Sequence, residues 1–276
     1  MKLDYNTDMY RDLTGTNYYY FYLAERELYK EFAARNPEVS FEGCAGGGAR
    51  TDIANIFNLY HGHFVSDTVH PLEILRSRQN IALRMLPSYM GSWIVAQEIH
   101  FPVNTYTDHD IENRMKVISC GDAWWEQTVD YSMDFVMKCN LPGEYGFSCD
   151  LSSFSEKTLE TIRKANEFGI ANKGLLETGI CHLLTKPKKI NDISGWTAFQ
   201  IESRKLNQSL VFVYRLTGDE ESYLVFPKGI ESDKKYKINI DEGEMLTVDG
   251  FDIINNGIRI DCSMRYMAKI IKIEVV

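Results

Sequence analysis

The alternation of short apolar runs with helical stretches through the first two-thirds of the chain limits the fold more than any other feature. Parallel strands need long crossover connections, usually helices, so repeated strand–helix units indicate a parallel sheet or an α/β barrel. A complete eight-unit barrel takes about 250 residues, whereas this stretch ends near Lys173 and holds roughly five units. We therefore expect either a small open sheet or a barrel whose first units are missing. The expected strands span residues 2–6, 39–42, 63–66 and 145–151, and the expected helices span residues 17–35, 52–60, 72–86 and 153–173.

Two of the expected helices carry further signals. Within residues 17–35, Phe21, Leu28 and Phe32 are spaced to form one buried face. At the start of residues 153–173, Ser153 and Glu156 have the spacing of a capping box, which predicts that Ser153 is the N-cap.

The last third of the chain lacks a helical period and consists of short runs rich in Val, Ile, Tyr and Phe. Turn signals at 217–219, 249–250 and 255–257 separate these runs, a pattern typical of an antiparallel sheet or sandwich. The change of character places a boundary between Gly174 and Asp192. The expected strands span residues 196–203, 209–216, 222–227, 235–240, 257–262 and 268–275.

Charge and cysteine content narrow the class of protein. The 276 residues carry 30 basic and 39 acidic side chains, a formal net charge of −9. Nucleic acids and anionic membranes require a cationic footprint, so we expect neither as a partner. No run of about 18 apolar residues occurs, so no membrane span is expected. Six scattered cysteines favour reduced thiols and a cytoplasmic protein, with secretion left open because a leader would lie upstream of Met1.

The first candidate site residues lie on the first expected strand. Side chains alternate between the two faces of a strand, so Lys2, Asp4 and Asn6 share one face. Three polar groups on one face of a buried strand are costly unless they serve a site, and Lys2 would hold the Asp4 carboxylate ionised. A solvated N-terminus, where such residues cost nothing, explains the same pattern equally well.

A glycine-rich stretch follows the second expected strand, from Glu42 through Cys44 to Arg50. Glycines let the backbone approach a ligand closely and leave N–H donors free, yet neither the Walker spacing nor a GxGxxG pattern occurs. A tight strand-to-helix turn is the commoner reason for three glycines. Cys44 alone is more often a buried small hydrophobe than a functional thiol.

A carboxylate ends the third expected strand, at Ser66-Asp67. Most such aspartates cap the following helix. If the strands form one parallel sheet, however, Asp4 and Asp67 lie at the same edge of that sheet and point into one cavity. Two carboxylates on opposite sides of a sugar ring are the catalytic groups of most glycoside hydrolases. His61 and His63 share a strand face without a third ligand at suitable spacing, so no metal site is expected.

The order and spacing of three motifs resemble the family 36 glycoside hydrolases, the microbial retaining α-galactosidases. The motifs are Lys-x-Asp-x-Asn at 2–6, Cys-x-Gly-Gly-Gly-x-Arg at 44–50 and Ser-Asp at 66–67. The resemblance implies a partial (β/α)8 TIM barrel, about strands 4–8, followed by a C-terminal antiparallel β-sandwich domain. It divides the chain into the C-terminal portion of the catalytic barrel, residues 1–177, and the β domain, residues 178–276.

The resemblance also implies an activity and the residues that carry it. The expected protein is a retaining glycoside hydrolase of the α-galactosidase type, which cleaves terminal α-galactosyl residues of oligosaccharides and needs no metal or organic cofactor. Asp4 is the expected nucleophile and Asp67 the expected acid/base. The expected substrate-binding residues are Lys2, Asn6, Cys44 and Gly47.

Departures from the family pattern leave alternatives open. Leu3 and Phe64 stand where the family usually has Trp, and Thr68 stands where it has Asn. An α-N-acetylgalactosaminidase of the same fold and a transglycosylase are therefore runner-up activities, and an inactive carbohydrate-binding or assembly module is the alternative outside enzymes. The expected partners are an α-galactoside oligosaccharide, the missing N-terminal half of the enzyme and, as an option, a second copy in a homo-oligomer.

Overall fold

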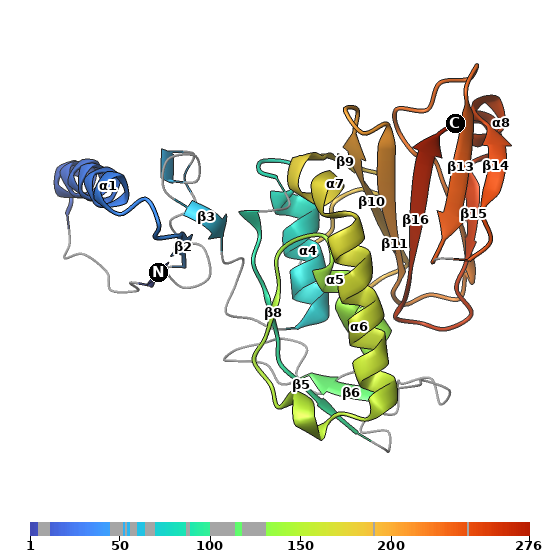
Figure 1. Ribbon diagram of the computed structural model, residues 1–276, viewed down its shortest axis with the longest axis horizontal. Coiled ribbons are helices and arrows are strands. Elements are labelled where there is room, and N and C mark those ends of the chain that lie inside the picture. Colours follow the sequence, from blue (N-terminus) through green and yellow to red (C-terminus); the bar gives the residue numbers. More distant parts are fainter. Residues whose placement is uncertain are drawn as a thin grey trace.

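The computed structural model of the chain describes residues 1–4, 12–44, 52, 54–55, 60–63, 70–86, 89–99, 114–117, 131–189, 191–241 and 243–276. Along its long axis Figure 1 shows a small N-terminal sheet with one helix, then a group of helices, then a large sheet. No helix in these ranges is long and apolar enough to cross a membrane.

A three-stranded parallel sheet forms the N-terminal part, in the order β1–β2–β3. Its strands are β1 (Lys2–Leu3), β2 (Phe41–Gly43) and β3 (Tyr60–His63), and helix α1 (Thr16–Arg35) lies in the crossover between the first two. The strands are parallel, as the strand–helix alternation predicts. Strand β3 lies three residues upstream of the prediction, at 60–63 instead of 63–66.

Helix α1 packs on this sheet through a face that overlaps the predicted one. Tyr29 and Ala33 pack against the buried Phe41, and the predicted Phe32 contacts the Phe41 ring edge-to-face at 5.5 Å. Leu28, also predicted to be buried, is 62% exposed. The contact face is therefore rotated slightly from the predicted one, because apolar residues also lie beside the predicted positions and their spacing does not choose between adjacent faces.

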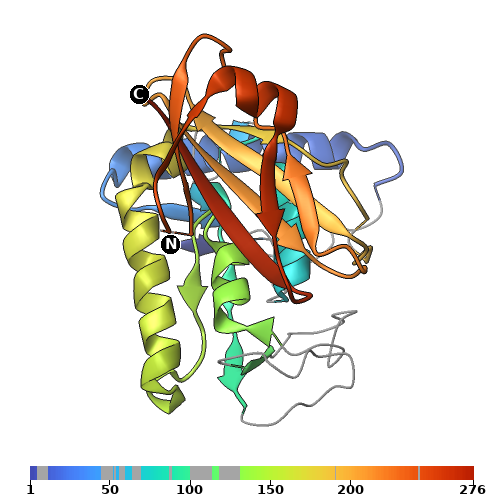
Figure 2. The same cartoon turned by 90° about the vertical axis from the view of Figure 1, so that its right-hand side faces the viewer.

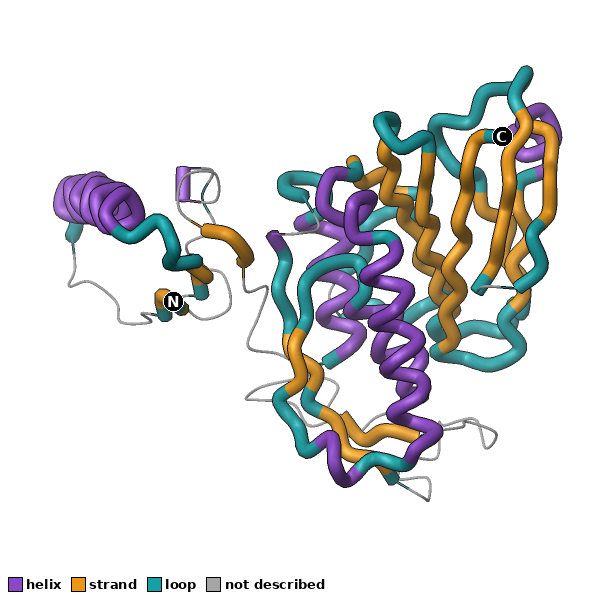
Figure 3. Tube along the Cα trace, viewed as in Figure 1, coloured by secondary structure: helices purple, strands orange, loops and turns teal. Residues whose placement is uncertain are grey.

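Helices α4–α7 form a layer in the middle of the molecule, the purple segments beside the large sheet in Figure 3. A short parallel pair, β4 with β8, lies beside these helices, and an antiparallel sheet of β5, β6 and β7 follows β4 in the chain. The bounds are α4 (Pro71–Ile81), α5 (Met133–Asn140), α6 (Glu156–Ala171), α7 (Lys173–Thr178), β4 (Trp93–Ile94), β5 (Ala96–Glu98), β6 (Arg114–Val117), β7 (Tyr131–Ser132) and β8 (Gly146–Phe147).

The start of α6 differs from the prediction. Its N-cap is Ser155, whose hydroxyl accepts a hydrogen bond from the Thr158 N–H over 3.3 Å, whereas Ser153 lies in a preceding 3₁₀ turn, η2 (Leu151–Ser153). The Glu98 carboxylate accepts three further bonds here, from Ser155 N at 2.6 Å, Ser155 Oγ at 2.7 Å and Thr158 Oγ1 at 3.0 Å. An anion is stabilised at a helix N-terminus, so Glu98 fastens β5 to the start of α6.

The last third forms a six-stranded antiparallel sheet in the order β14–β13–β16–β11–β10–β9 and a two-stranded pair, β12 with β15. Strands β10 and β13 have the predicted bounds, whereas β14 and helix α8 were not predicted. The bounds are β9 (Ile180–Leu183), β10 (Trp196–Ser203), β11 (Gln208–Arg215), β12 (Ser222–Val225), β13 (Lys235–Ile240), β14 (Leu246–Asp249), α8 (Gly250–Asn256), β15 (Ile258–Asp261) and β16 (Met267–Val275).

Both faces of the six-stranded sheet are covered, as Figures 1 and 2 show. One face packs on the helices, with Phe199, Phe212 and Tyr214 stacked in the shared core. The other face packs on β12, β15 and α8. Burial on both sides explains why β10 and β11 read as nearly continuous apolar runs rather than alternating ones. The division of the chain at residues 177 and 178 stays a prediction.

Candidate functional site

The end of β1 carries a lysine–aspartate pair on the face that points away from α1. Leu3 packs toward α1, and because side chains alternate along a strand, Lys2 and Asp4 lie on the opposite face. Lys2 Nζ lies 3.5 Å from Asp4 Oδ2, and the two side chains are 37% and 36% exposed. The ammonium group favours the ionised form of the Asp4 carboxylate by direct charge attraction.

Cys44 follows β2 at the level of Asp4. Its backbone N–H donates to the Leu3 carbonyl over 2.9 Å, and Leu3 is in register with Gly43. Asp4 and Cys44 are therefore neighbours at the carboxyl ends of two parallel strands. Cys44 is only 1% exposed. The structure thus brings together Lys2, Asp4 and Cys44 from the set that the sequence singles out.

The other predicted site residues, Asn6, Gly47 and Asp67, lie outside the described residues. Strand β3 runs parallel to β2 and ends at His63, four positions before Asp67 in the chain. Each of the three motifs thus follows a strand of one parallel sheet, and α/β folds place their functional residues at that carboxyl edge. Across the described ranges, no group of three or more His, Cys, Asp or Glu is arranged to hold a metal ion.

His70, which the sequence analysis missed, lies buried at the start of α4, three positions after Asp67. Its Nδ1 accepts a hydrogen bond from the Leu72 N–H at 3.4 Å, so Nε2 carries the proton and faces the Tyr131 hydroxyl at 3.3 Å. Burial lowers the pKa of His70 to about 3, so the ring is neutral at ordinary pH. The signal in the sequence is His70-Pro71, a capping side chain followed by proline at the first helical position.

We expect His70 to make the fold sensitive to acid. The pKa of His70 is about 3 in the folded chain and near the ordinary histidine value of 6.5 when the chain is unfolded. The unfolded chain therefore binds the proton first, and the stabilisation is complete above pH 6.5 and is lost progressively as the pH falls toward 3. The full loss, reached below about pH 3, is on the order of 5 kcal/mol. Urea unfolding at about pH 7 and about pH 4.5 should show about 2–3 kcal/mol of it.

The matched control is His70→Asn, which keeps a capping oxygen but has no titrating ring. Its free energy of unfolding should change less between the two pH values than that of the unaltered chain. Equal losses in both proteins would contradict the assignment to His70.

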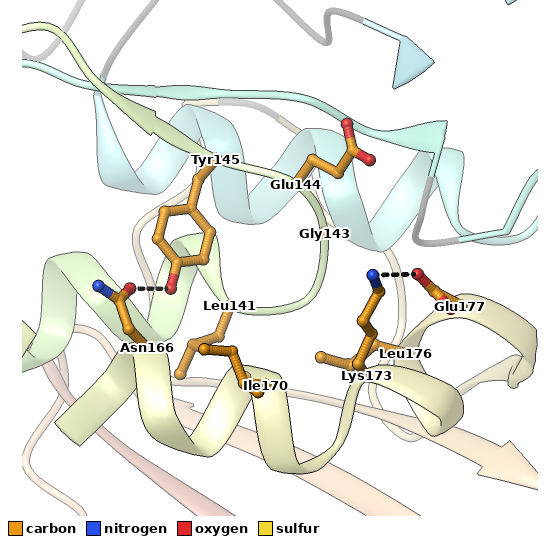
Figure 4. A pocket seen from close by; sticks show the side chains of 10 residues that line it. Leu141, Gly143, Glu144, Tyr145, Asn166, Ile170, Lys173, Leu176 and Glu177 are labelled. Atoms are coloured by element: carbon orange, nitrogen blue, oxygen red, sulfur yellow. Dashed lines mark hydrogen bonds and ion pairs between the residues drawn. The ribbon is translucent and has the colours of Figure 1, made fainter. Parts of the chain in front are cut away.

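A pocket of about 410 Å³ lies between the loop before β8, the end of α6 and α7 (Figure 4). Leu141 forms part of an apolar floor. The Tyr145 hydroxyl donates to Asn166 Oδ1 over 2.7 Å, and Lys173 Nζ lies 3.4 Å from Glu177 Oε1. None of the site residues expected from the sequence lines this pocket, and these polar groups are engaged with one another. We therefore centre the candidate site on the ends of β1 and β2 instead.

Comparison with known proteins connects the chain to sugar-cleaving enzymes. The model of the melibiase family matches residues 3–132. The chain is 22% identical over 261 residues to the α-galactosidase Mel36A of Lactobacillus acidophilus, a match that covers 92% of this chain and 31% of the relative.

Solved structures agree in fold. An α-galactosidase from Lactobacillus brevis has a TM-score of 0.74 and 17% identity, covering all of this chain and 35% of its own. A variant of the family 36 α-galactosidase AgaA from Geobacillus stearothermophilus, solved in complex with raffinose, has a TM-score of 0.66 and 18% identity, covering 91% of this chain and 30% of its own. The chain spans about a third of the length of these relatives. Over residues 3–132 the chain thus matches the melibiase family model, and the solved structures that it resembles in fold include family 36 α-galactosidases.

Proposed function

We propose that this chain supplies both catalytic carboxylates of a retaining α-galactosidase. The observation that carries the proposal is the Lys2–Asp4 pair on the polar face of β1, level with Cys44, because it offers an ionised nucleophile where the family resemblance expects one. Variants of the relative AgaA were solved in complex with raffinose and with stachyose. Both sugars end in an α-galactosyl group, which supports that group as the substrate of this site.

The proposed reaction is a double displacement. Asp4 attacks the anomeric carbon while Asp67 gives its proton to the leaving oxygen, so that a bond to Asp4 forms as the glycosidic bond breaks. The Asp67 carboxylate then takes a proton from water, whose oxygen attacks the same carbon and releases Asp4. The nearby negative charge of Asp4 favours the protonated form of Asp67 at the start. We expect the two carboxyl groups to lie about 5–5.5 Å apart, as retaining enzymes require.

The remaining parts of the proposed site hold the sugar. Cys44 and the backbone at Gly47 would contact ring hydroxyls, and Lys2 and Asn6 would border the same subsite. Lys2 has a second role, because its ammonium keeps Asp4 ionised before attack. The runner-up substrate is an α-N-acetylgalactosaminide, and a sugar acceptor in place of water would turn the same chemistry into transglycosylation.

We further propose that the parallel part is a portion of a (β/α)8 barrel, strands 4–8, and that the C-terminal part is a β-sandwich. Strand β1 is an edge strand of the described sheet, and an open edge is a template for pairing with another chain. Helix α1 exposes Tyr19, Tyr20 and Leu28 at 62%, 63% and 62%. These features favour an upstream polypeptide that completes the barrel, and they also fit the second candidate, an inactive assembly module.

We expect the 276-residue chain alone to hydrolyse p-nitrophenyl α-galactoside poorly or not at all. Barrel closure and part of the sugar subsite would come from the upstream polypeptide. Adding the part of the Lactobacillus acidophilus relative that precedes the matched segment should restore turnover, and we call that mixture the complemented enzyme. Release of p-nitrophenol measures the rate, with the N-acetylgalactosaminide assayed in parallel. Robust turnover by the chain alone would refute the need for a partner, and no turnover by the mixture would favour the inactive module.

A further inference from the structure

A glutamate on β2 carries a buried carboxylate oxygen that the fold leaves without a donor. Phe41 packs toward α1, so the next residue, Glu42, points to the opposite face. Glu42 is in register with Lys2 and therefore shares the polar face of Lys2 and Asp4. Its Oε1 is buried, and within the described part of the chain no group donates a hydrogen bond to it. Such an acceptor lowers the stability of a fold.

The charges around Glu42 do not compensate for its burial. The pKa of Glu144, in the loop before β8, is raised first by burial and then by the negative charges of Glu42 and Glu177. Glu42 therefore faces other carboxylates, and the cation nearest in register, Lys2, pairs with Asp4. Among the described residues, no lysine, arginine or histidine forms an ion pair with Glu42.

Glu98 is an example of a carboxylate with a structural role, because other groups of the chain satisfy its oxygens with hydrogen bonds. It receives three hydrogen bonds, from Ser155 N, Ser155 Oγ and Thr158 Oγ1, all at 3.0 Å or less. Glu42 Oε1 has none from described groups, although it lies in a regular strand beside the candidate site. Groups that break a local rule at a cost in stability tend to mark functional positions.

We infer that Glu42 is a further sugar-binding residue, whose Oε1 accepts a hydrogen bond from a ring hydroxyl of a galactose-like ligand. The inference rests on the proposed function, which puts the sugar against this face of β1 and β2. Glu42 precedes Cys44 by two residues and is level with Lys2, so it lies deeper below the strand ends than Asp4. The donors within its reach are therefore those remote from the anomeric carbon.

Calorimetric titration of the complemented enzyme tests this role without requiring turnover. The probes are galactose, which is neutral, and 1-deoxygalactonojirimycin, whose ring nitrogen is protonated at neutral pH. Glu42→Gln should weaken binding of galactose about threefold, because a charge-assisted hydrogen bond from a hydroxyl is lost. It should weaken binding of the iminosugar about tenfold, because the through-space attraction between the carboxylate and the protonated nitrogen is lost as well. The matched control is Glu38→Gln, which removes the same charge from the exposed turn before β2 and should change neither affinity.

Thermal unfolding separates a binding role from a structural one. Glu42→Gln removes a buried charge without a donor, so its Tm should rise by about 2–4 °C. Weaker binding together with a lower Tm would assign Glu42 to the fold and overturn the inference. Unchanged affinity for both ligands would overturn it as well, and so would a lack of binding by the unaltered complemented enzyme.

An Asp4→Asn variant, titrated in the same way, distinguishes a failure of the Glu42 inference from a failure of the proposed function. Weaker binding in Glu42→Gln alone would keep Glu42 as a ligand residue and remove Asp4 from the site. Weaker binding in Asp4→Asn alone would keep the proposed site and overturn the role of Glu42.

Discussion

In the complemented enzyme, Asp4→Ala should lower kcat/KM for p-nitrophenyl α-galactoside by at least about 10⁴-fold, and azide should restore product formation. The loss corresponds to about 5 kcal/mol of transition-state stabilisation. Without the Asp4 carboxylate no covalent intermediate forms, and the vacated space admits a small anion. Azide then attacks the anomeric carbon from the side that Asp4 occupied, while Asp67 protonates the leaving oxygen. The product is β-galactosyl azide, with inverted configuration, and proton NMR of the purified product identifies it.

Asp67→Ala should respond to azide with the opposite stereochemistry. Asp4 can still expel p-nitrophenolate, a leaving group that needs little protonation, so the covalent intermediate accumulates. Azide needs no general base and attacks this intermediate from the side that the leaving group vacated. The product is therefore α-galactosyl azide, with net retention. The pair of variants assigns each carboxylate to one role by product configuration, which a general loss of folding does not mimic.

Asp219→Ala is a suitable control, because this side chain is fully exposed in the C-terminal part and forms only a loose 3.6 Å pair with Arg265. Its kcat/KM should match that of the unaltered protein. If Asp4→Ala keeps most of its activity, or gives the same azide anomer as Asp67→Ala, the proposed assignment of the two aspartates is wrong.

The strands of the last third were the most predictable part of the fold. β10 and β13 occupy the predicted residues because β-branched and aromatic runs end at clear turn signals. The sequence signal failed at Asp249-Gly250, expected as a turn, where β14 ends and α8 begins. An aspartate followed by glycine suits a turn and a helix start alike, so local chemistry does not separate the two.

The sequence predicted the candidate site only where the position of a side chain follows from local backbone geometry. Strand alternation alone puts Lys2 and Asp4 on one face, and the structure has them 3.5 Å apart. Burial is a tertiary property, so no local pattern marks Glu42 as an acceptor without a described donor or His70 as a buried cap. The face of α1 was predicted only in part for the same reason: Phe32 contacts Phe41 of the sheet as expected, whereas Leu28 is exposed.

Arg78→Met should cause the largest loss of stability of any single change considered, about 4 kcal/mol. Arg78 is fully buried on α4 and donates to the Met90 carbonyl at 3.0 Å, Ser92 Oγ at 2.5 Å and the Glu144 carbonyl at 3.0 Å. These acceptors directly precede β4 and β8, so one side chain links the starts of the two parallel strands. Burial lowers the pKa of Arg78 to about 10, which leaves the guanidinium charged at neutral pH. Methionine fills similar space but donates no hydrogen bond, so the Met90 and Glu144 carbonyls keep only their partners around Ser92 and Glu144, and the buried Ser92 hydroxyl loses its donor.

Two further variants separate the effect of the Arg78 charge from the effect of its hydrogen-bonding geometry. Arg78→Lys keeps the charge but replaces a planar fork by a single point donor, so we expect a loss of about 2–3 kcal/mol. Arg163→Met removes an arginine that is 53% exposed and should cost no more than about 0.5 kcal/mol. Urea unfolding followed by circular dichroism gives all three values. We expect Arg78→Met to be the least stable variant, Arg78→Lys to be intermediate and Arg163→Met to be the most stable, because only a buried guanidinium supplies all three hydrogen bonds. Equal stabilities of Arg78→Met and Arg163→Met would contradict a role for Arg78 in holding β4 to β8.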